Sequence, residues 1–289
     1  MAKFLIIQNP AAGNGSAENY LPEVISAIER LQIPYVLKKT AKKFDAQDNV
    51  KEWVTPDITD IVVVGGDGTL NEVVNGLYPH LKPIRLISTG TGNDLVKNLK
   101  NHTMDNLFLT NEFNQIDLFT VNDRIGINAL GLGFDGEVVS EMDEKDLKIN
   151  GMFAYMIFVL SKLFKFRAPR YHITADGVDY RGKYYITCVG NGMAVGGGFF
   201  LTPKAHIEDG NLDICLIRDI PMILRPYYLI KVILKIHPSD KKVIYRQFKE
   251  MIIRSSRQIM GQLDGQLVTG KDFVIKLIGE KLHIVSHKH

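Results

Sequence analysis

Several features of secreted and membrane-spanning proteins are missing from this sequence. Among its 289 residues are two cysteines, Cys188 and Cys215, which lie in apolar runs and form no C-x-x-C pair. We therefore expect two reduced core thiols, as is usual in the cytoplasm, and no disulfide or redox pair. The longest apolar stretch, residues 152–160, is well short of the ~20 residues that a membrane-crossing helix needs, and residues 1–8 turn polar too early for a signal peptide. The sequence thus predicts a cytoplasmic protein without a membrane-spanning segment.

An excess of charge of one sign is also missing. The formal net charge is +3, and the sequence contains no arginine-rich run and no stripe of interleaved aromatic residues. A nucleic-acid partner is therefore not expected. The 8 histidines show no metal-ligand spacing, and the chain has no internal repeat or low-complexity segment. With 45% hydrophobic residues the chain can bury a full core, and its length favours two domains.

The most informative stretch is a run of β-branched residues, Ile61 to Val64, which is followed by Gly65, Gly66 and Gly68. Such a run is typical of a strand buried on both faces, as in parallel sheets. The glycines can adopt positive φ and let a ligand approach the backbone. An ordinary tight strand-to-helix turn is the alternative, although such turns seldom hold three glycines in four positions.

Asp67 and Thr69 add a carboxylate and a hydroxyl to this turn. We expect Thr69 to cap a helix that begins at Leu70, so that backbone amides at the helix N-terminus face the ligand. The acid favours a metal-bridged nucleotide, because a bare carboxylate would repel a polyphosphate. Glu72 and Asp94 could support the metal, or simply interact favourably with the dipoles of the predicted helices in which both lie near the start.

The first 120 residues alternate strands and helices. We expect strands at residues 4–7, 35–38, 61–64 and 84–87, and helices at 21–31 and 46–54. This alternation predicts an open parallel sheet with helices, and ligands bind such sheets at the carboxyl ends of the strands. The loops at 9–16, 39–40, 65–69 and 88–94 should therefore converge on one crevice.

After about residue 117 short strand-like runs dominate, at 124–128, 171–175, 184–189, 212–217, 251–253 and 273–277. Turn signals at 175–177 and 208–211 separate some of them. The fold class is therefore α/β plus all-β, with a C-terminal β-sandwich-like domain. We expect a nucleotide-binding α/β domain at 1–120 and a substrate-binding β-sandwich at 121–280, with a final strand or tail near 280–289 that could return to the first domain.

Several short motifs resemble one protein family when they are taken in order. They are Asn9-Pro10, the stretch from Gly65 to Glu72, Gly90 to Asp94, Asn191-Gly192 with Gly196 to Gly198, Pro203 to Ala205, Asp209-Gly210 with Leu212, and Leu263-Asp264-Gly265. The chain is similar over nearly its whole length to the catalytic domain of diacylglycerol kinases. It is most similar to the soluble bacterial lipid kinases, which are related to sphingosine kinases and more distantly to NAD kinases.

The resemblance implies a site for ATP and Mg²⁺. It implies that ATP is contacted by Asn9, Thr40, Gly65, Gly66, Asp67, Gly68, Thr69, Leu70, Asn71 and Thr91. Asp67 would take part in the magnesium and phosphate site and is a candidate catalytic residue.

A separate structural magnesium ion is implied at the turn around Asp209, held by its carboxylate and by the main-chain carbonyls of His206 and Asn211. Oxygen ligands suit this hard cation, while an ordinary Asp-Gly hairpin turn is the alternative. Asp264 matches the general base of the family, with a simple turn aspartate as the alternative. Gln266 stands where the family usually has an acid, and a neutral amide cannot act as a base.

The implied reaction is transfer of the γ-phosphate of ATP to a lipid hydroxyl, most simply that of diacylglycerol, in phospholipid metabolism. Phosphoryl transfer needs positioning and charge neutralisation, which glycine loops, magnesium and one carboxylate supply. A NAD kinase is the alternative enzyme. A non-catalytic nucleotide-binding regulator is the alternative of another class, and Gln266 lends it some weight.

Two helical stretches, 151–166 and 222–236, combine many apolar residues with lysine and arginine. Such a helix can lie on an anionic membrane surface. Core packing and a homodimer interface stay open as alternatives. The expected partners are a lipid substrate, the inner face of the membrane as a peripheral contact, and a second copy of the chain.

Overall fold

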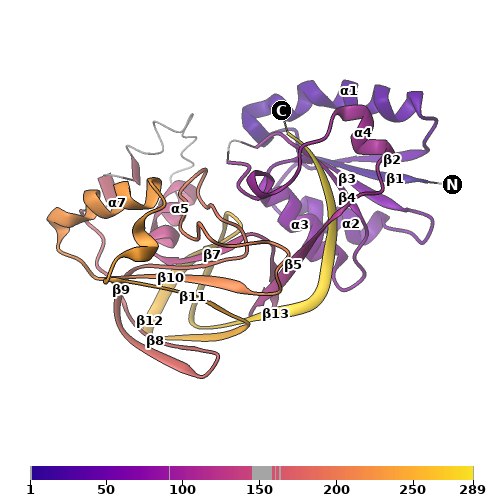
Figure 1. The fold of residues 1–289 in the computed structure, drawn as a ribbon. Helices are drawn as coiled ribbons and strands as arrows, with labels where there is room; N and C mark the ends of the chain where they lie inside the picture. Colours follow the sequence, from indigo (N-terminus) through magenta and orange to yellow (C-terminus); the bar gives the residue numbers. More distant parts are fainter. Residues whose placement is uncertain (1, 91, 145–157, 160, 163, 289) are drawn as a thin grey trace. The chain divides into compact units, whose positions relative to one another are not determined.

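The computed structural model describes residues 2–90, 92–144, 158–159, 161–162 and 164–288. The chain divides into two compact units, which we call unit 1 (Met1–Leu118 with Gly279–His289) and unit 2 (Phe119–Ile278). Figure 1 shows helices among the strands of unit 1 and mostly strands in unit 2. The predicted combination of an α/β part and a β-rich part is confirmed.

Unit 1 is built on a parallel sheet. Its strands are β1 (Phe4–Gln8), β2 (Tyr35–Lys39), β3 (Asp60–Gly65), β4 (Ile84–Ser88) and the last part of β13 (Gln266–Lys288). They are ordered β13-β4-β3-β1-β2. The strands are aligned at their starts, since Phe4 pairs with Asp60 and Ile61 pairs with Ile84. Every residue of β1, β3 and β4 is buried. The apolar runs of β1 and β3 predict this burial, and Arg85 of β4 is buried with Asp60 as its partner at 2.8 Å.

Helices cover both faces of this sheet. They are α1 (Ser16–Arg30), α2 (Asp45–Trp53), α3 (Asp67–Leu77) and α4 (Met104–Leu109). Figure 1 shows α1 and α4 on one side of the sheet and α2 and α3 on the other. Val24 and Ile28 of α1 and Leu107 of α4 pack with strand residues such as Ile6 and Val62 in one core cluster. The sheet therefore presents the carboxyl ends of its strands between two helical layers.

Helix α1 begins earlier than the sequence predicts. The expected start was residue 21, but the helix begins at Ser16, after the short turn η1 (Ala12–Gly15). Gly15 has φ 91° and turns the chain directly into the helix. Only glycine adopts this conformation without strain. Gly15 therefore lets the helix begin at residue 16, five residues before the predicted start. A further short turn, η2 (Leu95–Asn98), follows the loop after β4.

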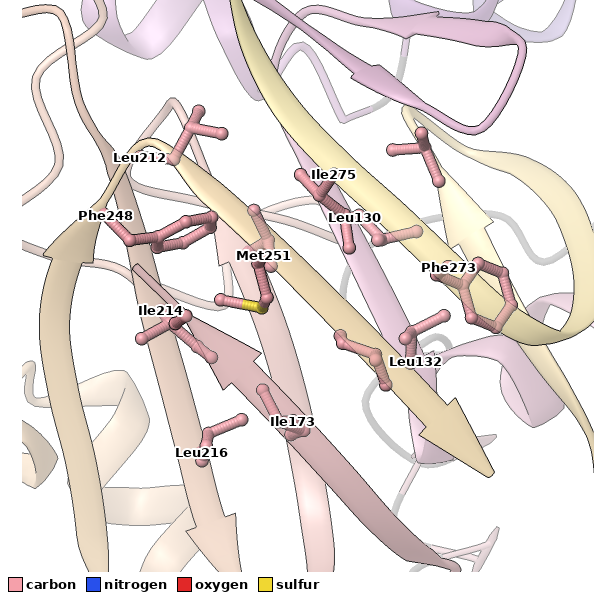
Figure 2. Packing of buried hydrophobic residues seen from close by; sticks show 14 of the residues in the cluster. Leu130, Leu132, Ile173, Leu212, Ile214, Leu216, Phe248, Met251, Phe273 and Ile275 are labelled. Atoms are coloured by element: carbon pink, nitrogen blue, oxygen red, sulfur yellow. The ribbon is translucent and has the colours of Figure 1, made fainter. Parts of the chain in front are cut away.

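Unit 2 is an antiparallel assembly. It contains the end of β5 (Asn114–Val121), β6 (Arg124–Gly126), β7 (Ala129–Gly133), α5 (Phe134–Glu144), β8 (Arg170–Ala175), β9 (Val178–Gly190), β10 (Leu212–Arg218), β11 (Val243–Phe248), β12 (Glu250–Leu263) and the first part of β13. Strands β9 and β12 each pair with both β7 and β8, so these four strands close on themselves. The closed arrangement encloses the core that Figure 2 shows, where Leu130, Ile214, Met251 and Phe273 meet.

The predicted helix over 222–236 is broken into shorter pieces. They are η3 (Met222–Leu224) and α7 (Arg225–Ile233), and the short turn η4 (His237–Ser239) follows beyond the predicted range. Pro226 lies in the first turn of α7, where its missing N–H is tolerated, and Lys235 has φ 60° just after the helix. The proline therefore favours the start of α7 at this point, and the left-handed conformation of Lys235 prevents the helix from continuing. The other predicted helix, 151–166, lies almost entirely outside the described residues.

Candidate active site

The glycine turn after β3 leads straight into α3. The helix begins at Asp67 and not at Leu70, because Gly66 is its N-cap in an extended conformation (φ −101°, ψ −172°). The prediction that Thr69 caps the helix is therefore wrong, since Thr69 is buried within the first turn. The amides of that turn lie at the carboxyl end of β3, where a helix N-terminus favours an anion.

The glycines of this turn serve close packing. Gly65, Gly66 and Gly68 are not among the residues with positive φ, so that part of the prediction is wrong. A Cβ on Gly65 would lie 2.8 Å from the Cβ of Thr69, and one on Gly66 would lie 3.1 Å from the Cα of Gly90. A Cβ on Gly68 would meet nothing within 4 Å. Gly65 thus leaves room for the Thr69 side chain, Gly66 lets the backbone of Gly90 approach, and Gly68 keeps the helix N-terminus uncovered by a side chain.

Hydrogen bonds connect this turn to the loops after β1 and β4. The Asp67 carboxylate accepts a hydrogen bond of 2.9 Å from the backbone N–H of Asp94. The amide of Asn9 donates to the Thr69 hydroxyl over 3.0 Å. The backbone N–H of Thr89 donates to the carbonyl of Gly65 over 3.0 Å. The structure therefore brings the loops after β1, β3 and β4 together, with the partly exposed Asp67 among them.

Thr40 lies beside the end of β1, since its N–H donates to the carbonyl of Gln8 over 2.8 Å. Glu72 connects α3 to the segment that follows Thr40: its carboxylate accepts hydrogen bonds from the N–H groups of Phe44 (3.1 Å) and Ala46 (3.3 Å). These bonds give hydrogen-bond acceptors to backbone N–H groups at the N-terminus of α2, where a negative charge is favourable. Burial raises the pKa of the Glu72 carboxyl. Glu72 therefore holds the N-terminus of α2 against α3, next to the segment that follows Thr40.

The remaining predicted nucleotide residues of α3 are less accessible. Leu70 is buried, and its N–H donates to the carbonyl of Gly66 over 3.1 Å. Asn71 is also buried, and its side-chain oxygen accepts a hydrogen bond of 3.1 Å from Asn75. The carboxylate of Asp94 pairs with Lys97 at 2.6 Å. Thr91 lies outside the described residues.

In unit 2, Asp264 and Gly265 form the two-residue turn of the β12–β13 hairpin. Both have positive φ, 50° and 83°, as in type I′ turns. The Asp264 carboxylate accepts hydrogen bonds from the backbone N–H groups of Ile127 (2.7 Å), Asn128 (2.9 Å) and Ala129 (2.8 Å). The side chain is buried, with a relative exposure of 6%. Asp264 thus fastens the hairpin to the segment before β7.

Two glutamines flank this turn. Gln262 accepts a hydrogen bond from the N–H of Gly265 (2.7 Å) and donates to the carboxylate of Asp135 at the start of α5 (2.8 Å). Gln266 is buried, and its side-chain Nε2 has no hydrogen-bond partner in the described chain. A buried amide without a partner is uncommon, because its desolvation is not compensated. Sequence reasoning missed Gln262 and Asp135, whose relation to the turn depends on strand pairing.

The turn at Asp209 is held by its own side chain. The carboxylate accepts hydrogen bonds from the N–H of Asn211 (2.9 Å) and from Nε2 of Gln247 (2.8 Å). The N–H of Asp209 donates to the carbonyl of His206 over 3.3 Å. This turn, with Gly210 at φ 71°, therefore brings the three predicted ligand residues into one short segment.

A second carboxylate lies near this turn. Asp213 is buried, and burial raises the pKa of its carboxyl, with a further contribution from the negative charge of Asp209. Neither oxygen of Asp213 makes a hydrogen bond of normal geometry, although the side chains of Tyr245 and Gln247 are nearby. Two neighbouring acids with spare oxygens fit a hard cation. No group of three or more His, Cys, Asp or Glu side chains in the described part of the chain is arranged for a metal.

Comparisons with known proteins cover both units. The sequence pattern of the diacylglycerol kinase catalytic domain matches residues 3–121. The pattern of the YegS C-terminal NAD kinase beta sandwich-like domain matches residues 128–286. A diacylglycerol kinase of Staphylococcus carnosus is 28% identical over 96% of this chain and 92% of its own length. A YegS-like protein of Yersinia enterocolitica, assigned as a lipid kinase, is 28% identical over 95% of this chain and 93% of its own.

A solved structure has the same fold. It is a crystal structure from Bacillus anthracis of a protein assigned as a diacylglycerol kinase, with a TM-score of 0.81 and 23% sequence identity. The match covers 98% of this chain and 94% of the other. At this identity the likeness shows the fold alone.

Proposed function

Because this chain belongs to the diacylglycerol kinase family of phosphotransferases, we propose that it transfers the γ-phosphate of ATP to the hydroxyl of a lipid, most simply diacylglycerol. The observation that carries the proposal is the Gly65–Thr69 turn at the N-terminus of α3, in a chain both of whose units match this family. Unit 1 takes the nucleotide and unit 2 takes the lipid.

Unit 1 offers a phosphate site. Backbone amides at the start of α3 bind phosphate oxygens, since a helix N-terminus carries a partial positive charge. Gly68 lets the phosphates approach the backbone closely, and Asn9 and Asp94 keep the neighbouring loops in place. Asp67 is the acid that would hold magnesium there. Bound magnesium supplies the charge neutralisation that phosphoryl transfer needs.

The turn at Asp209 supports a second, structural magnesium site. The Asp209 carboxylate and the carbonyls of His206 and Asn211 would hold the ion, and the buried carboxylate of Asp213 adds negative charge nearby. A cation at this place offsets the repulsion between two neighbouring acids. The role of this site is to stabilise unit 2.

Asp264 is the candidate proton acceptor for the lipid hydroxyl. Three backbone N–H donors hold its carboxylate in one orientation. Asp264 therefore has a positioning role besides its catalytic one. The amide of Gln266 cannot take up this proton, which is the observation that favours the non-catalytic regulator as a second candidate.

Radiolabel transfer from ATP tests the proposal. The purified chain is incubated with labelled ATP, magnesium and, in separate reactions, diacylglycerol, other lipids with hydroxyl groups, and NAD. We expect a labelled lipid and no labelled NAD, and we expect Asp67→Ala to lose the product. Labelled NAD would favour the NAD kinase. ATP binding without transfer to any acceptor would favour the regulator.

No helix that the structure describes is long and apolar enough to cross a membrane. Peripheral contact of this kinase with an anionic membrane surface is part of the proposal, because the proposed acceptor is a lipid.

A further inference from the structure

The segment from η3 to just beyond α7 carries an unusual concentration of exposed apolar side chains. Six of them are more than half exposed: Met222, Ile223, Tyr227, Ile230, Leu234 and Ile236. Ile223 is 84% exposed. Elsewhere in the described chain, Leu109 is the one other large apolar side chain above one half, at 61%. We call these six residues the α7 surface. Such a concentration marks an interaction site, whereas single exposed apolar residues are ordinary.

The exposed face belongs to a helix that is held firmly from its other side. Tyr228 and Val232 are buried in the second core cluster of unit 2. Arg225 is buried as well, and its guanidinium donates to the carbonyl of Phe166 over 3.0 Å. Just after the helix, the buried His237 ring contacts the carbonyl of Leu201 at 3.0 Å. The α7 surface is therefore presented by an anchored element.

The charges around this surface are mostly positive. Lys235 is exposed just after α7, and Lys241 and Lys242 are exposed just after η4. The acid among them, Asp240, accepts hydrogen bonds from the Tyr228 hydroxyl (2.9 Å) and from Lys231 (2.5 Å). Its negative charge is thus already balanced, and the margin of the α7 surface keeps a net positive charge.

An apolar face with a basic margin matches the chemistry of an anionic bilayer. Apolar side chains of an interfacial helix enter the boundary between headgroups and acyl chains, while lysines remain at the level of the phosphates. Tyr227 suits the same depth, since its ring is apolar and its hydroxyl is polar. Figure 1 shows α7 (orange) lying over the strands of unit 2, the unit to which the proposed function assigns the lipid.

We infer that the α7 surface is the membrane-docking site of this protein and that its occupant is an anionic lipid bilayer. The inference rests on the proposed function, because a kinase with a lipid acceptor must reach that acceptor in the bilayer. Docking is reversible, since one short helix buries a limited apolar area and depends on the lysines for part of its attraction.

Vesicle binding without substrate tests this inference separately from the reaction. The full chain is sedimented with vesicles of phosphatidylcholine alone or mixed with phosphatidylglycerol, without ATP and diacylglycerol. We expect binding to the anionic vesicles that weakens as salt is raised. The double variant Ile223→Asp, Ile230→Asp should lose at least ~10-fold of this binding, because two charges would have to enter the interface. The matched control Leu109→Asp, at the exposed apolar residue outside this stretch, should bind like the unchanged chain.

A fluorescence measurement reports insertion directly. The chain has 1 tryptophan, Trp53, so Trp53→Phe with Ile230→Trp places the only indole on the α7 surface. We expect its emission to shift to shorter wavelength with anionic vesicles and not with phosphatidylcholine vesicles. An unshifted spectrum together with unchanged sedimentation of the Ile223→Asp, Ile230→Asp variant would overturn the inference.

Two further readouts separate this inference from its alternatives. The Ile223→Asp, Ile230→Asp variant should keep its thermal stability and its activity on a short-chain, water-dispersed diacylglycerol. If the unchanged chain binds vesicles but phosphorylates no lipid, the proposed function fails and the docking site stands. If the variant changes a dimer into a monomer and still binds vesicles, the α7 surface is an interface between two copies and the inference fails.

Discussion

Two Asp-Gly pairs of the chain have proposed roles in the reaction, and the structure holds their carboxylates differently. Asp67 lies partly exposed in the first turn of α3 and accepts a hydrogen bond from the backbone N–H of Asp94. Asp264 is buried in a hairpin turn with φ 50° and accepts hydrogen bonds from three successive backbone N–H groups. The same residue pair is thus placed once at a helix N-terminus and once inside a backbone clamp.

The difference teaches that an Asp-Gly motif does not define a role by itself. At Asp67 the partial positive charge of the helix N-terminus and the adjacent glycines favour phosphate binding, and the carboxylate is the group that would hold a magnesium ion. At Asp264 most of the carboxylate's hydrogen-bonding capacity is already used inside unit 2. We therefore expect changes at Asp67 to reduce activity without reducing stability, and changes at Asp264 to reduce both.

The largest effect is expected for Asp264→Ala. It leaves the buried N–H groups of Ile127, Asn128 and Ala129 without their acceptor, and each unsatisfied group costs about 1–3 kcal/mol. The free energy of unfolding should therefore fall by at least ~3 kcal/mol in urea denaturation. Asp123→Ala, in the exposed turn between β5 and β6, is the matched control and should change it by no more than about 0.5 kcal/mol. A fully stable Asp264→Ala variant would refute the clamp.

Asp264→Asn separates the two roles of this residue. It keeps the shape of the side chain and one acceptor oxygen, so that more of the fold should survive than in Asp264→Ala. If Asp264 takes the proton from the lipid hydroxyl, the rate of the chemical step should fall by at least ~10²-fold while ATP still binds. Full activity in a folded Asp264→Asn variant would assign the base to another residue.

The opposite pattern is expected for Asp67→Ala. Loss of the carboxylate that organises magnesium and phosphates should lower the rate of lipid phosphorylation by about 10²–10³-fold. The melting temperature should change little, because Asp67 is partly exposed and donors there can turn to water. Near-normal phosphorylation by a folded Asp67→Ala variant would remove this residue from the site and weaken the comparison with Asp264.

A smaller effect is expected for Asp209→Ala. The N–H of Asn211 and the amide of Gln247 lose their acceptor, but both hydrogen bonds are exposed and the donors can bond to water instead, so the free energy of unfolding should fall by no more than about 0.5–1.5 kcal/mol. Any increase of the melting temperature with magnesium should disappear as well, because a ligand that binds the folded state stabilises it. Asp176→Ala is the matched control: Asp176 also accepts backbone hydrogen bonds, from Lys249 and Glu250, but is not a predicted ligand. An unchanged response to magnesium in Asp209→Ala would contradict the structural ion.

The smallest effect is expected for Gln266→Glu in a working kinase. The change places an acid next to the Asp264 turn and should leave the activity similar or raise it. A buried charge has a desolvation cost, so the melting temperature should fall slightly. Lipid phosphorylation that appears only in the Gln266→Glu variant would show that the unchanged chain is a regulator and not an enzyme.

Much of unit 1 could be predicted from the sequence because its strands are continuous apolar runs. The run from Ile61 to Val64 can be satisfied only by burial on both faces, and the structure buries it completely. Ile84 to Ile87 is buried as well, with Arg85 paired with Asp60 at 2.8 Å. The boundaries of the helices were less predictable. The start of α3 depends on the extended conformation of Gly66, whose close approach to Gly90 involves a distant part of the sequence.

In unit 2 the sequence pattern shows only parts of the long strands. Residues 251–253 and 273–277 were predicted, but β12 runs from Glu250 to Leu263 and β13 from Gln266 to Lys288. The pattern fades where β12 carries polar, outward-facing residues such as Arg257 and where its register with β13 shifts after Arg254. Strand β7 was not predicted, because Gly131 and Gly133 are poor strand formers and only pairing with β9 and β12 keeps them extended.

The clamp at Asp264 was beyond the reach of sequence reasoning for the same reason. Its three donors belong to residues 127–129, which are 135–137 positions earlier in the chain. Sequence similarity marks Asp264 as important without showing what it contacts. A carboxylate followed by glycine looks the same whether it faces a ligand or its own backbone.

The course of β13 has a consequence for how the protein is made. This strand begins in unit 2 and ends in unit 1, where residues 284–288 pair with residues 84–88 of β4. During synthesis, the sheet of unit 1 therefore cannot gain its fifth strand until unit 2 has been synthesised. The pairing of β13 with β4 then closes a loop that includes all of unit 2. A single proteolytic cut within unit 2 would place β4 and the end of β13 on different fragments, so neither fragment would contain all the strands of the unit 1 sheet.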